Sequence, residues 1–209
     1  MNINKIKTYM LSAVTALSLA SCLDKYPEDS IPMDDAVTTV GDIDKLVIGI
    51  YDSFKSSALY SGNLTILPDL QADFVYCVKG YTNVYGDIFR WNDIKATNPD
   101  IEAVYAALYD VVNCCNFLLD NVEKVKANTT DDNLLDRLDQ YCGEAYFARA
   151  LAYSELIKLF CKAYDSDEQA AQTLGVVLTE HYKGDEPTRR ASLKKSYEFV
   201  LADLDKAQG

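Results

Sequence analysis

The thiol of Cys22 stands in a setting that favours its acylation. An apolar run at residues 11–19 and the small pair Ala20-Ser21 come directly before it, and two lysines but no acidic residue precede the run. The run is about half as long as the roughly 20 apolar residues that cross a bilayer. The pattern therefore indicates an export signal, residues 1–21, whose removal makes Cys22 the lipid-carrying first residue of a bacterial lipoprotein. An ordinary signal peptide followed by an incidental cysteine is the alternative.

Other residue types in the chain offer little catalytic chemistry. Asp69 and Asp73 are four residues apart and could share a helix face, as the two carboxylates of a glycosidase must share a sugar bond. Acidic proteins produce such pairs by chance on solvated faces. The chain has no GxSxG, P-loop or HExxH motif, and His181 is its only histidine. The sequence therefore predicts that the protein is not an enzyme.

Five cysteines remain besides Cys22, and this odd number leaves at least one of them unpaired. No CxxC motif occurs, so the spacing typical of a zinc site is absent, and neither a metal nor a cofactor is predicted. Small buried side chains are the expected role. A disulfide stays open as an alternative, because export permits one. The five are Cys77, Cys114, Cys115, Cys142 and Cys161.

The net charge of the chain limits the classes of partner that it can bind. The formal net charge is −12, and removal of the basic signal would make the remainder more acidic still. Such a chain does not bind nucleic acid non-specifically. It also gains nothing from an anionic lipid surface, so a covalent lipid would have to hold it at a membrane. With 49% apolar residues, the chain is long and apolar enough for one folded domain.

After residue 38, apolar residues recur at the spacing of amphipathic helices. Residues 22–38 contain two prolines and five acids and are expected to form an extended tether. The domain, residues 39–209, begins with a helix over 40–56 that Thr39 and Asp42 would cap. A short helix is expected over 67–76, and the rest of 57–98 is expected to be loop or short strands.

Three further helices are predicted along the chain. Asn98-Pro99-Asp100 begins the first of them, a polar loop follows at 126–132, and Asp131 or Asp132 begins the second, which fades near Tyr164. Residues 165–190 are expected to be a long connection before Ser192 caps the last helix. Its apolar stripe would comprise Leu193, Tyr197, Val200, Leu201 and Leu204. The fold class is therefore all-α, with amphipathic helices and long irregular loops.

Several segments, in this order after a lipoprotein signal, resemble the SusD/RagB family of outer-membrane glycan-binding lipoproteins. The clearest is Gly143–Tyr153, an alanine-rich helix containing the pair Arg149-Ala150. The others include Tyr105–Asn116 and the stretch from Arg190-Ala191-Ser192 to Asp203-Leu204. The resemblance covers most of the chain after the signal.

The resemblance implies a fold, a function and a partner. Family members build TPR-like helix pairs, capture extracellular oligosaccharides and pass them to a SusC-like TonB-dependent transporter for nutrient uptake. The protein would be held in the cell outer membrane by its lipid and exposed at the surface. Two departures stand out: Phe160-Cys161-Lys162-Ala163 replaces the usual aromatic-glycine turn, and family members are much longer. The chain is expected to be the N-terminal part of such a protein, without the second half that completes the glycan site.

Aromatic residues crowd the segment 76–92, where we expect sugar contacts. Flat rings match the apolar C–H faces of sugars, and amide groups pair with sugar hydroxyls. Trp91 and Asn92 are the first candidates for glycan binding, followed by Tyr81 and Tyr85. The alternative is that these rings pack beneath a long loop.

A second function class is a helical TPR-like adaptor that binds only a partner protein. Stacked helix pairs often present concave peptide-binding surfaces, and this interpretation needs no sugar site. Both functions can hold together in one protein.

Overall fold

The computed structural model describes residues 35–78, 85–92, 94–182 and 189–209. Residues Met1–Val37 and Thr38–Gly209 form two separate units, and the second carries all the helices and strands discussed below. The predicted signal, Cys22, Tyr81 and all but the last four residues of the predicted tether lie outside the described residues. The second unit contains α2 (Val40–Phe54), α3 (Asn63–Gln71), α4 (Gly86–Phe89), α5 (Pro99–Ala127), α6 (Asp132–Phe160), α7 (Asp167–Gln172), β1 (Leu174–Val177), β2 (Arg190–Ser192) and α8 (Leu193–Ala207).

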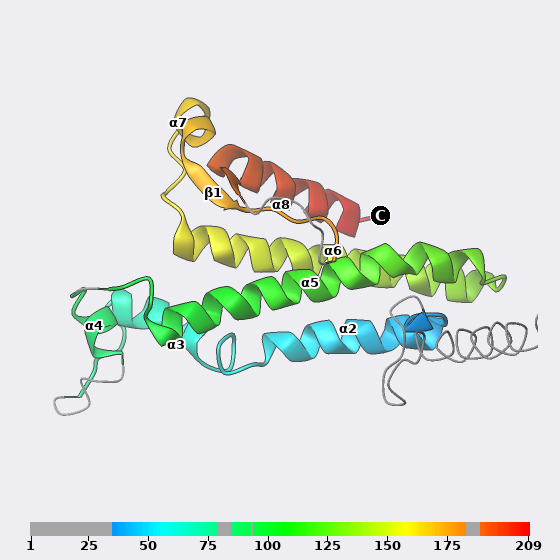
Figure 1. Cartoon of the computed structure of the whole chain (residues 1–209), viewed down its shortest axis with the longest axis horizontal. Coiled ribbons are helices and arrows are strands. Elements are labelled where there is room, and N and C mark those ends of the chain that lie inside the picture. The colour runs from blue at the N-terminus through cyan, green and yellow to red at the C-terminus, as the bar shows by residue number, and fades with distance from the viewer. Residues whose placement is uncertain (1–34, 79–84, 93, 183–188) are drawn as a thin grey trace, which may run out of the picture. The chain divides into compact units, whose positions relative to one another are not determined.

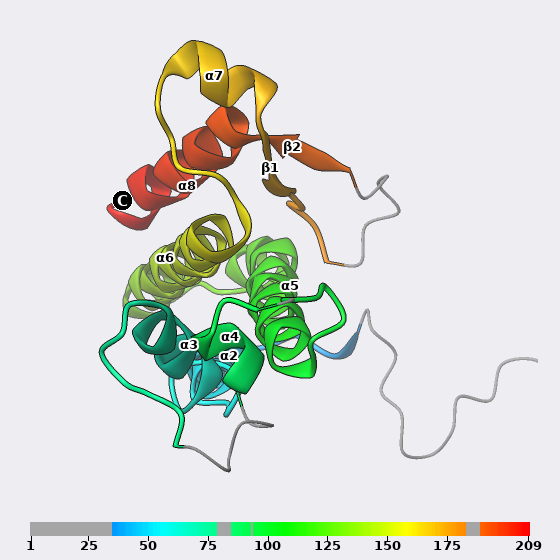
Figure 2. The same ribbon diagram turned by 90° about the vertical axis from the view of Figure 1, so that its left-hand side faces the viewer.

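This unit is arranged in three layers, which confirms the predicted helical class. Helices α5 and α6 lie side by side in the middle layer, with α2, α3 and α4 on one side and α7, α8 and the β1–β2 pair on the other (Figure 1, Figure 2). Helix α6 packs on α5, α8 and α2. It is therefore the element around which the others are assembled.

Side-chain caps set the first residue of each long helix as the sequence predicts. In α2, the Asp42 N–H donates to Thr39 Oγ1 (3.2 Å) and the Thr39 N–H donates to Asp42 Oδ2 (3.1 Å), which completes a capping box. Asn98 caps α5, Asp131 caps α6 and Ser192 caps α8. The ends are predicted less well, because α3 lies at 63–71 rather than 67–76 and α6 ends at Phe160, before Tyr164.

Small side chains let the layers approach closely. Ala145, Ala148 and Ala152 of α6 are all buried, as the alanine-rich pattern suggests. At Gly143, a Cβ atom would lie 3.1 Å from the Ala207 carbonyl oxygen at the end of α8. A larger residue there would push α8 away from α6.

The connection at 165–190 has more structure than predicted. It contains α7 and β1, and β1 pairs antiparallel with β2, so that Leu174 faces Ser192 and Val177 faces Arg190. A tyrosine from α5 completes the other edge of β1: the Val177 N–H donates to the Tyr109 hydroxyl (3.1 Å), and that hydroxyl donates to the Val177 carbonyl (3.0 Å). Tertiary contacts thus make a strand from a short apolar run.

A buried ion pair joins α6 to α8. Arg149 and Asp203 have side chains that are 3% and 1% exposed, and the guanidinium Nε and Nη2 donate to the two carboxylate oxygens at 2.7 and 2.8 Å. Arg149 Nη1 also donates to Asn116 Oδ1 of α5 (2.6 Å). The Asn116 amide donates in turn to the Thr179 carbonyl beyond β1 (3.1 Å). One polar network therefore links four segments of the chain.

This ion pair explains why the predicted stripe of α8 is partly wrong. Tyr197 and Leu201, which were expected to face the core, are exposed, whereas Ser196 and Asp203 are buried. The helix is turned so that Asp203 meets Arg149 and the Ser196 hydroxyl accepts a hydrogen bond from the Val176 N–H (3.1 Å). A stripe drawn from apolar residues alone cannot show this rotation.

A cation in the first turn of α8 is compensated locally. The helix dipole disfavours Lys194 at this end of the helix. Its Nζ lies 2.7 Å from Asp167 Oδ2 of α7, and this hydrogen bond, together with that of Tyr164, lowers the pKa of Asp167.

Within the described residues, no helix is both long and apolar enough to cross a membrane.

We predict that Asp203→Asn strongly destabilises the protein. The substitution keeps the side-chain shape but leaves the buried Arg149 charge without its carboxylate, which should lower the free energy of unfolding by about 3 kcal/mol. Urea denaturation followed by circular dichroism measures this change. Asp205→Asn removes an equal charge from an exposed position of the same helix and should change stability by less than about 0.5 kcal/mol. Equal effects of the two substitutions would contradict the prediction.

Candidate functional site

Two helix ends in the layer of α3 and α4 hold residues in the left-handed backbone region. At the end of α4, the Trp91 N–H donates to the Ile88 carbonyl (3.1 Å) and the Asn92 N–H donates to the Asp87 carbonyl (2.9 Å). These are the two bonds of a Schellman motif, with Trp91 (φ 52°) at the position that glycine usually takes. At the end of α3, Asp73 (φ 61°) takes the equivalent position, and the Phe74 N–H donates to the Asp69 carbonyl (3.0 Å).

The residues with left-handed backbone lie in one segment of the chain. Within the described residues, the non-glycine residues with positive φ are Asp73, Tyr85 and Trp91. Tyr85 and Trp91 each cost roughly 1–2 kcal/mol relative to glycine in the same conformation, whereas aspartate adopts it more readily. Strained backbone is found preferentially at functional sites, so this segment is where a ligand site is to be sought.

The same helix ends display aromatic rings to solvent. Phe74 is 80% exposed, Tyr76 is 75% exposed and Trp91 is 64% exposed. In a Schellman motif the residue at the position of Phe74 usually packs back on its own helix, but here it does not. The structure therefore places Trp91 and Asn92 on an exposed surface. Phe74 was missed because the predicted helix over 67–76 included it.

Tyr85 plays a different part from Trp91. Its hydroxyl donates to Asn63 Oδ1 (2.7 Å) at the start of α3, and the Asn63 amide reaches the backbone and side chain of Asp100 in α5 (3.4 Å each). Burial, with a smaller effect of the Asp100 charge, raises the pKa of Tyr85. Tyr85 thus ties α4 to α3 and α5 and positions the segment that carries Trp91.

Two hollows lie where α3 meets the end of α6. One, of about 340 Å³, is bordered by Glu155 and Lys158, and a smaller one, of about 70 Å³, reaches Ile88 of α4; both share Gln71 and Leu159. Glu155 is 9% exposed and accepts hydrogen bonds from Lys158 Nζ (2.7 Å) and the Tyr60 hydroxyl (3.2 Å). Burial and the Glu155 charge raise the pKa of Tyr60 to about 12. Amide, carboxylate and ammonium groups therefore border the hollows near the aromatic segment.

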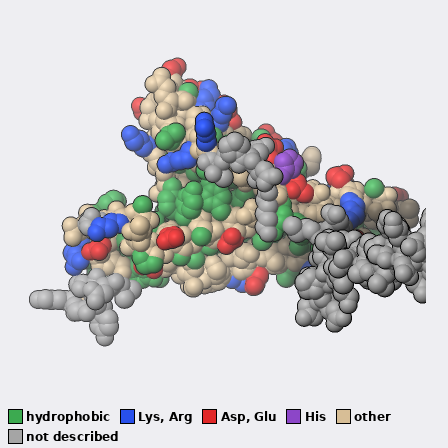
Figure 3. Space-filling model, viewed as in Figure 1, with side chains coloured by type: hydrophobic (Ala, Val, Ile, Leu, Met, Phe, Trp, Pro, Cys, Tyr) green, Lys and Arg blue, Asp and Glu red, His purple; other side chains and the backbone are tan. Residues whose placement is uncertain are grey.

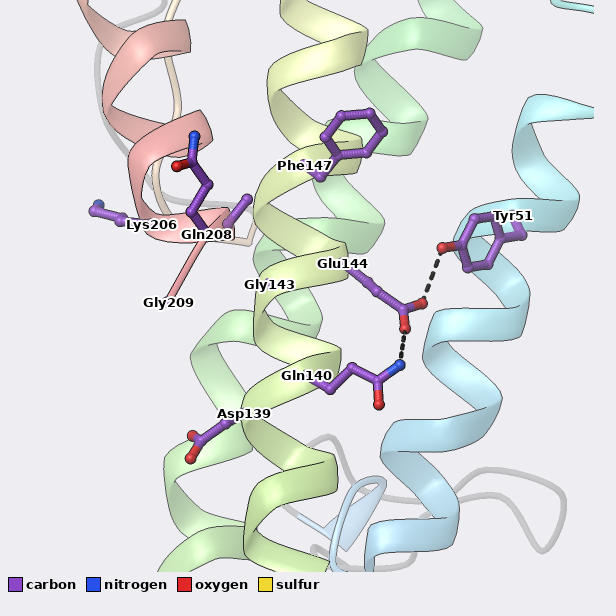
Figure 4. A pocket seen from close by; sticks show the side chains of 10 residues that line it. Tyr51, Asp139, Gln140, Gly143, Glu144, Phe147, Lys206, Gln208 and Gly209 are labelled. Atoms are coloured by element: carbon purple, nitrogen blue, oxygen red, sulfur yellow. Dashed lines mark hydrogen bonds between the residues drawn. The ribbon is translucent and has the colours of Figure 1, made fainter.

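A separate, larger hollow of about 450 Å³ lies over the solvent side of α6, between α2 and the end of α8. Figure 4 shows Tyr51 of α2 and Gln140 of α6 both directed at Glu144. The Tyr51 hydroxyl donates to Glu144 Oε2 (2.9 Å), and the Gln140 amide donates to Oε1 (3.0 Å). The hydrogen bond to Glu144 raises the pKa of Tyr51. Sequence reasoning missed this surface because its residues are spread over three helices.

The structure gives no support to a catalytic carboxylate pair. Asp69 lies in α3, whereas Asp73 follows the end of that helix on left-handed backbone, so the two do not share a helix face. Cys114, Cys115, Cys142 and Cys161 are free thiols. Within the described ranges, no group of histidine, cysteine and acidic side chains has the arrangement of a metal site.

Comparison with models of known protein families shows which family the chain belongs to. A family model named SusD-like_3, described as starch-binding associating with outer membrane, matches residues 22–209. The chain belongs to this SusD-like family. The family is one of carbohydrate-binding proteins associated with the outer membrane, and the resemblance inferred from Gly143–Tyr153 and its neighbours is confirmed. A comparison with curated proteins found no significant match.

Solved structures share the fold of this SusD-like chain. SusD superfamily proteins from Bacteroides thetaiotaomicron and Bacteroides fragilis are similar to it at 23% and 22% identity, with TM-scores of 0.66 and 0.69. A protein from Bacteroides vulgatus described as a candidate sugar-binding protein is similar at 24% identity and a TM-score of 0.69. Each comparison covers 82% of this chain but only 37%, 39% and 37%, respectively, of the solved chains. The chain thus spans less than two-fifths of these proteins.

We predict that Trp91→Gly is more stable than Trp91→Ala by about 1 kcal/mol. Both substitutions remove the ring, but only glycine adopts the left-handed conformation without steric cost. Urea denaturation of the two variants measures the difference. At Asp136, an exposed position inside α6, the order should reverse, because alanine favours ordinary helix. An alanine variant at position 91 as stable as the glycine variant would contradict the left-handed assignment.

Proposed function

We propose that this SusD-like chain takes part in binding oligosaccharides at the cell surface, through the exposed aromatic segment around α3 and α4. The observation that carries the proposal is Trp91, which presents its ring to solvent from a backbone conformation that favours glycine. A tryptophan at such a position costs stability, so a role beyond folding accounts for it best.

The chemistry of the segment suits a sugar. Trp91, Phe74 and Tyr76 provide flat apolar faces, and Asn92 follows Trp91 directly with an amide that can pair with hydroxyls. Gln71 borders the adjoining hollows and adds a second amide. Tyr85 contributes by holding the segment in place through Asn63, and Tyr81 stays a candidate from the sequence alone. Membership of a family described as starch-binding supports this choice of ligand.

The same family membership supports a proposal for the partner and the anchor. We propose that Cys22 carries the lipid that holds the protein in the outer membrane, and that captured oligosaccharide passes to a SusC-like TonB-dependent transporter for nutrient uptake. The family description of outer-membrane association supports the location. The match to the family begins at residue 22, where the export signal is predicted to be removed.

A protein-binding role is a second candidate, and one surface favours it. Figure 3 shows apolar side chains gathered between the β1–β2 pair and α5. In this part of the fold, the Tyr105 ring lies 4.9 Å from that of Tyr109 and 5.0 Å from that of Phe160, and Tyr105 is partly exposed. A partly exposed aromatic cluster of this kind is typical of a contact with another protein.

We predict that Trp91→Ala weakens binding of maltoheptaose to the purified chain about tenfold. Loss of one stacking ring removes about 1.4 kcal/mol of binding free energy, which isothermal titration calorimetry resolves. Phe147→Ala removes a ring of comparable exposure from the α6 surface and should leave the affinity unchanged. If Trp91→Ala binds maltoheptaose and a panel of other oligosaccharides as tightly as the parent, Trp91 is not part of the site.

We predict that Cys22→Ser releases the protein from membranes. The unsubstituted protein, expressed in a bacterium that processes lipoproteins, should sediment with the outer membrane, and mass spectrometry should find acyl chains on residue 22. The serine variant should lack the acyl mass and appear in the soluble fraction or retain its signal. A free Cys22 thiol in the mature protein would refute the lipoprotein assignment.

A further inference from the structure

The hollow over α6 presents one carboxylate that only neutral groups contact. Glu144 accepts hydrogen bonds from the Tyr51 hydroxyl and the Gln140 amide, and neither carries charge. Within the described residues, no lysine, arginine or histidine forms an ion pair with Glu144, whereas the neighbouring Asp139 is paired with Lys126 (2.7 Å). The charge of Glu144 therefore remains uncompensated within the hollow.

The hydrogen-bonding capacity left in the hollow is mostly that of acceptors. A carboxylate has about four acceptor positions, and Glu144 uses two of them. The Gln140 amide oxygen and the Tyr51 hydroxyl oxygen can also accept, while the Gln140 nitrogen has one N–H left to donate. A sugar hydroxyl has one donor and two acceptor positions, but a guanidinium has five donors and no acceptor. The surface thus matches a guanidinium better than a sugar.

Apolar side chains stand beside this carboxylate. Tyr51 is 53% exposed and Phe147, one turn after Glu144 in α6, is 54% exposed. Figure 4 shows the Tyr51 hydroxyl of α2 directed at the Glu144 carboxylate, while the Phe147 ring projects from α6 one turn further along, away from that carboxylate. Ile48 is also exposed, one turn before Tyr51. Aromatic faces bind guanidinium groups favourably, and the apolar rim suits the residues that flank an arginine in a protein segment.

Other cations near the hollow do not satisfy Glu144. Lys206 borders the hollow from α8, but its Nζ lies 5.0 Å from the centre of the Tyr146 ring. In Figure 4, Lys206 projects from α8 and points away from α6, whereas Glu144 projects from the opposite side of α6 toward α2. Arg137 lies two turns before Glu144 and interacts with Asp44 and Tyr141. Among the described residues, no cation therefore lies against Glu144, and its carboxylate is open to a cation from a partner.

We infer that Glu144, Tyr51 and Phe147 form a docking site for an arginine side chain carried by an apolar segment of a partner protein. The guanidinium donates to both Glu144 oxygens and lies beside the Tyr51 ring, and the apolar residues that flank the arginine contact Phe147. The net charge of −12 draws basic segments toward the molecule and adds to the rate of association. This site is distinct from the proposed sugar surface, since it is built by α2 and α6 rather than by the ends of α3 and α4.

The test titrates the purified, isotope-labelled chain with the peptide acetyl-Gly-Leu-Arg-Leu-Gly-amide. NMR should show shifts of the Gln140 side-chain amide, and binding should weaken as salt is raised. The same peptide with citrulline in place of arginine has the same shape without the charge and should bind at least about tenfold more weakly. Equal binding of the two peptides would overturn the inference.

Variants locate the contact. Glu144→Gln keeps the shape of the side chain and should weaken arginine-peptide binding about tenfold, and Phe147→Ala should weaken it several-fold. Asp136→Asn removes an equal charge from α6 two turns earlier and should leave it unchanged. Trp91→Ala should also leave it unchanged, which separates this site from the sugar site. The inference would be refuted if Glu144→Gln bound the arginine peptide with unaltered affinity. It would also be refuted if maltoheptaose, and not the arginine peptide, shifted the Gln140 signals.

Discussion

The ion pair between Arg149 and Asp203 is the constraint on which the arrangement of the helices depends. Its two charges are almost fully removed from water, a state that is costly unless every donor and acceptor is satisfied. Satisfying them requires α8 to lie across α6 and requires Asn116 of α5 to be within reach. Asn116 then holds the chain beyond β1 through the Thr179 carbonyl. Apolar packing alone would permit several rotations of α8, whereas this network permits one.

Much of the helical framework could be predicted because its signals are local. Thr39, Asn98, Asp131 and Ser192 each satisfy N–H groups within three residues, so the start of each helix follows from neighbouring side chains. The rotation of α8 could not be predicted, because an aspartate in an amphipathic helix is expected to face solvent. Its partner, Arg149, lies 54 residues away in the sequence. The strand β1 was missed for the same reason, since its partners lie in β2 and α5.

The residues of the candidate site also differ in whether the sequence could predict them. Trp91 and Asn92 could be chosen from composition alone, and the structure adds the reason they stand out, a left-handed helix end that displays the ring. Phe74 was hidden by a helix predicted to be too long. The surface around Glu144 could not be foreseen, because Tyr51 lies 93 residues away in sequence and reaches it only through the packing of α2 on α6. Sites built on one segment are visible in a sequence, and sites built across elements are not.

The hydroxyl of Tyr109 has a consequence for the behaviour of the protein in a crowded environment. A short two-stranded sheet leaves edges whose free amide and carbonyl groups can pair with the same segment of another copy, which is how many proteins begin to aggregate. At Val177 both groups are already bonded to one phenol oxygen, so a tyrosine takes the place of a third strand. Among the described residues, this pair of bonds leaves Val177 without a backbone group for a second copy of β1 to pair with at this edge.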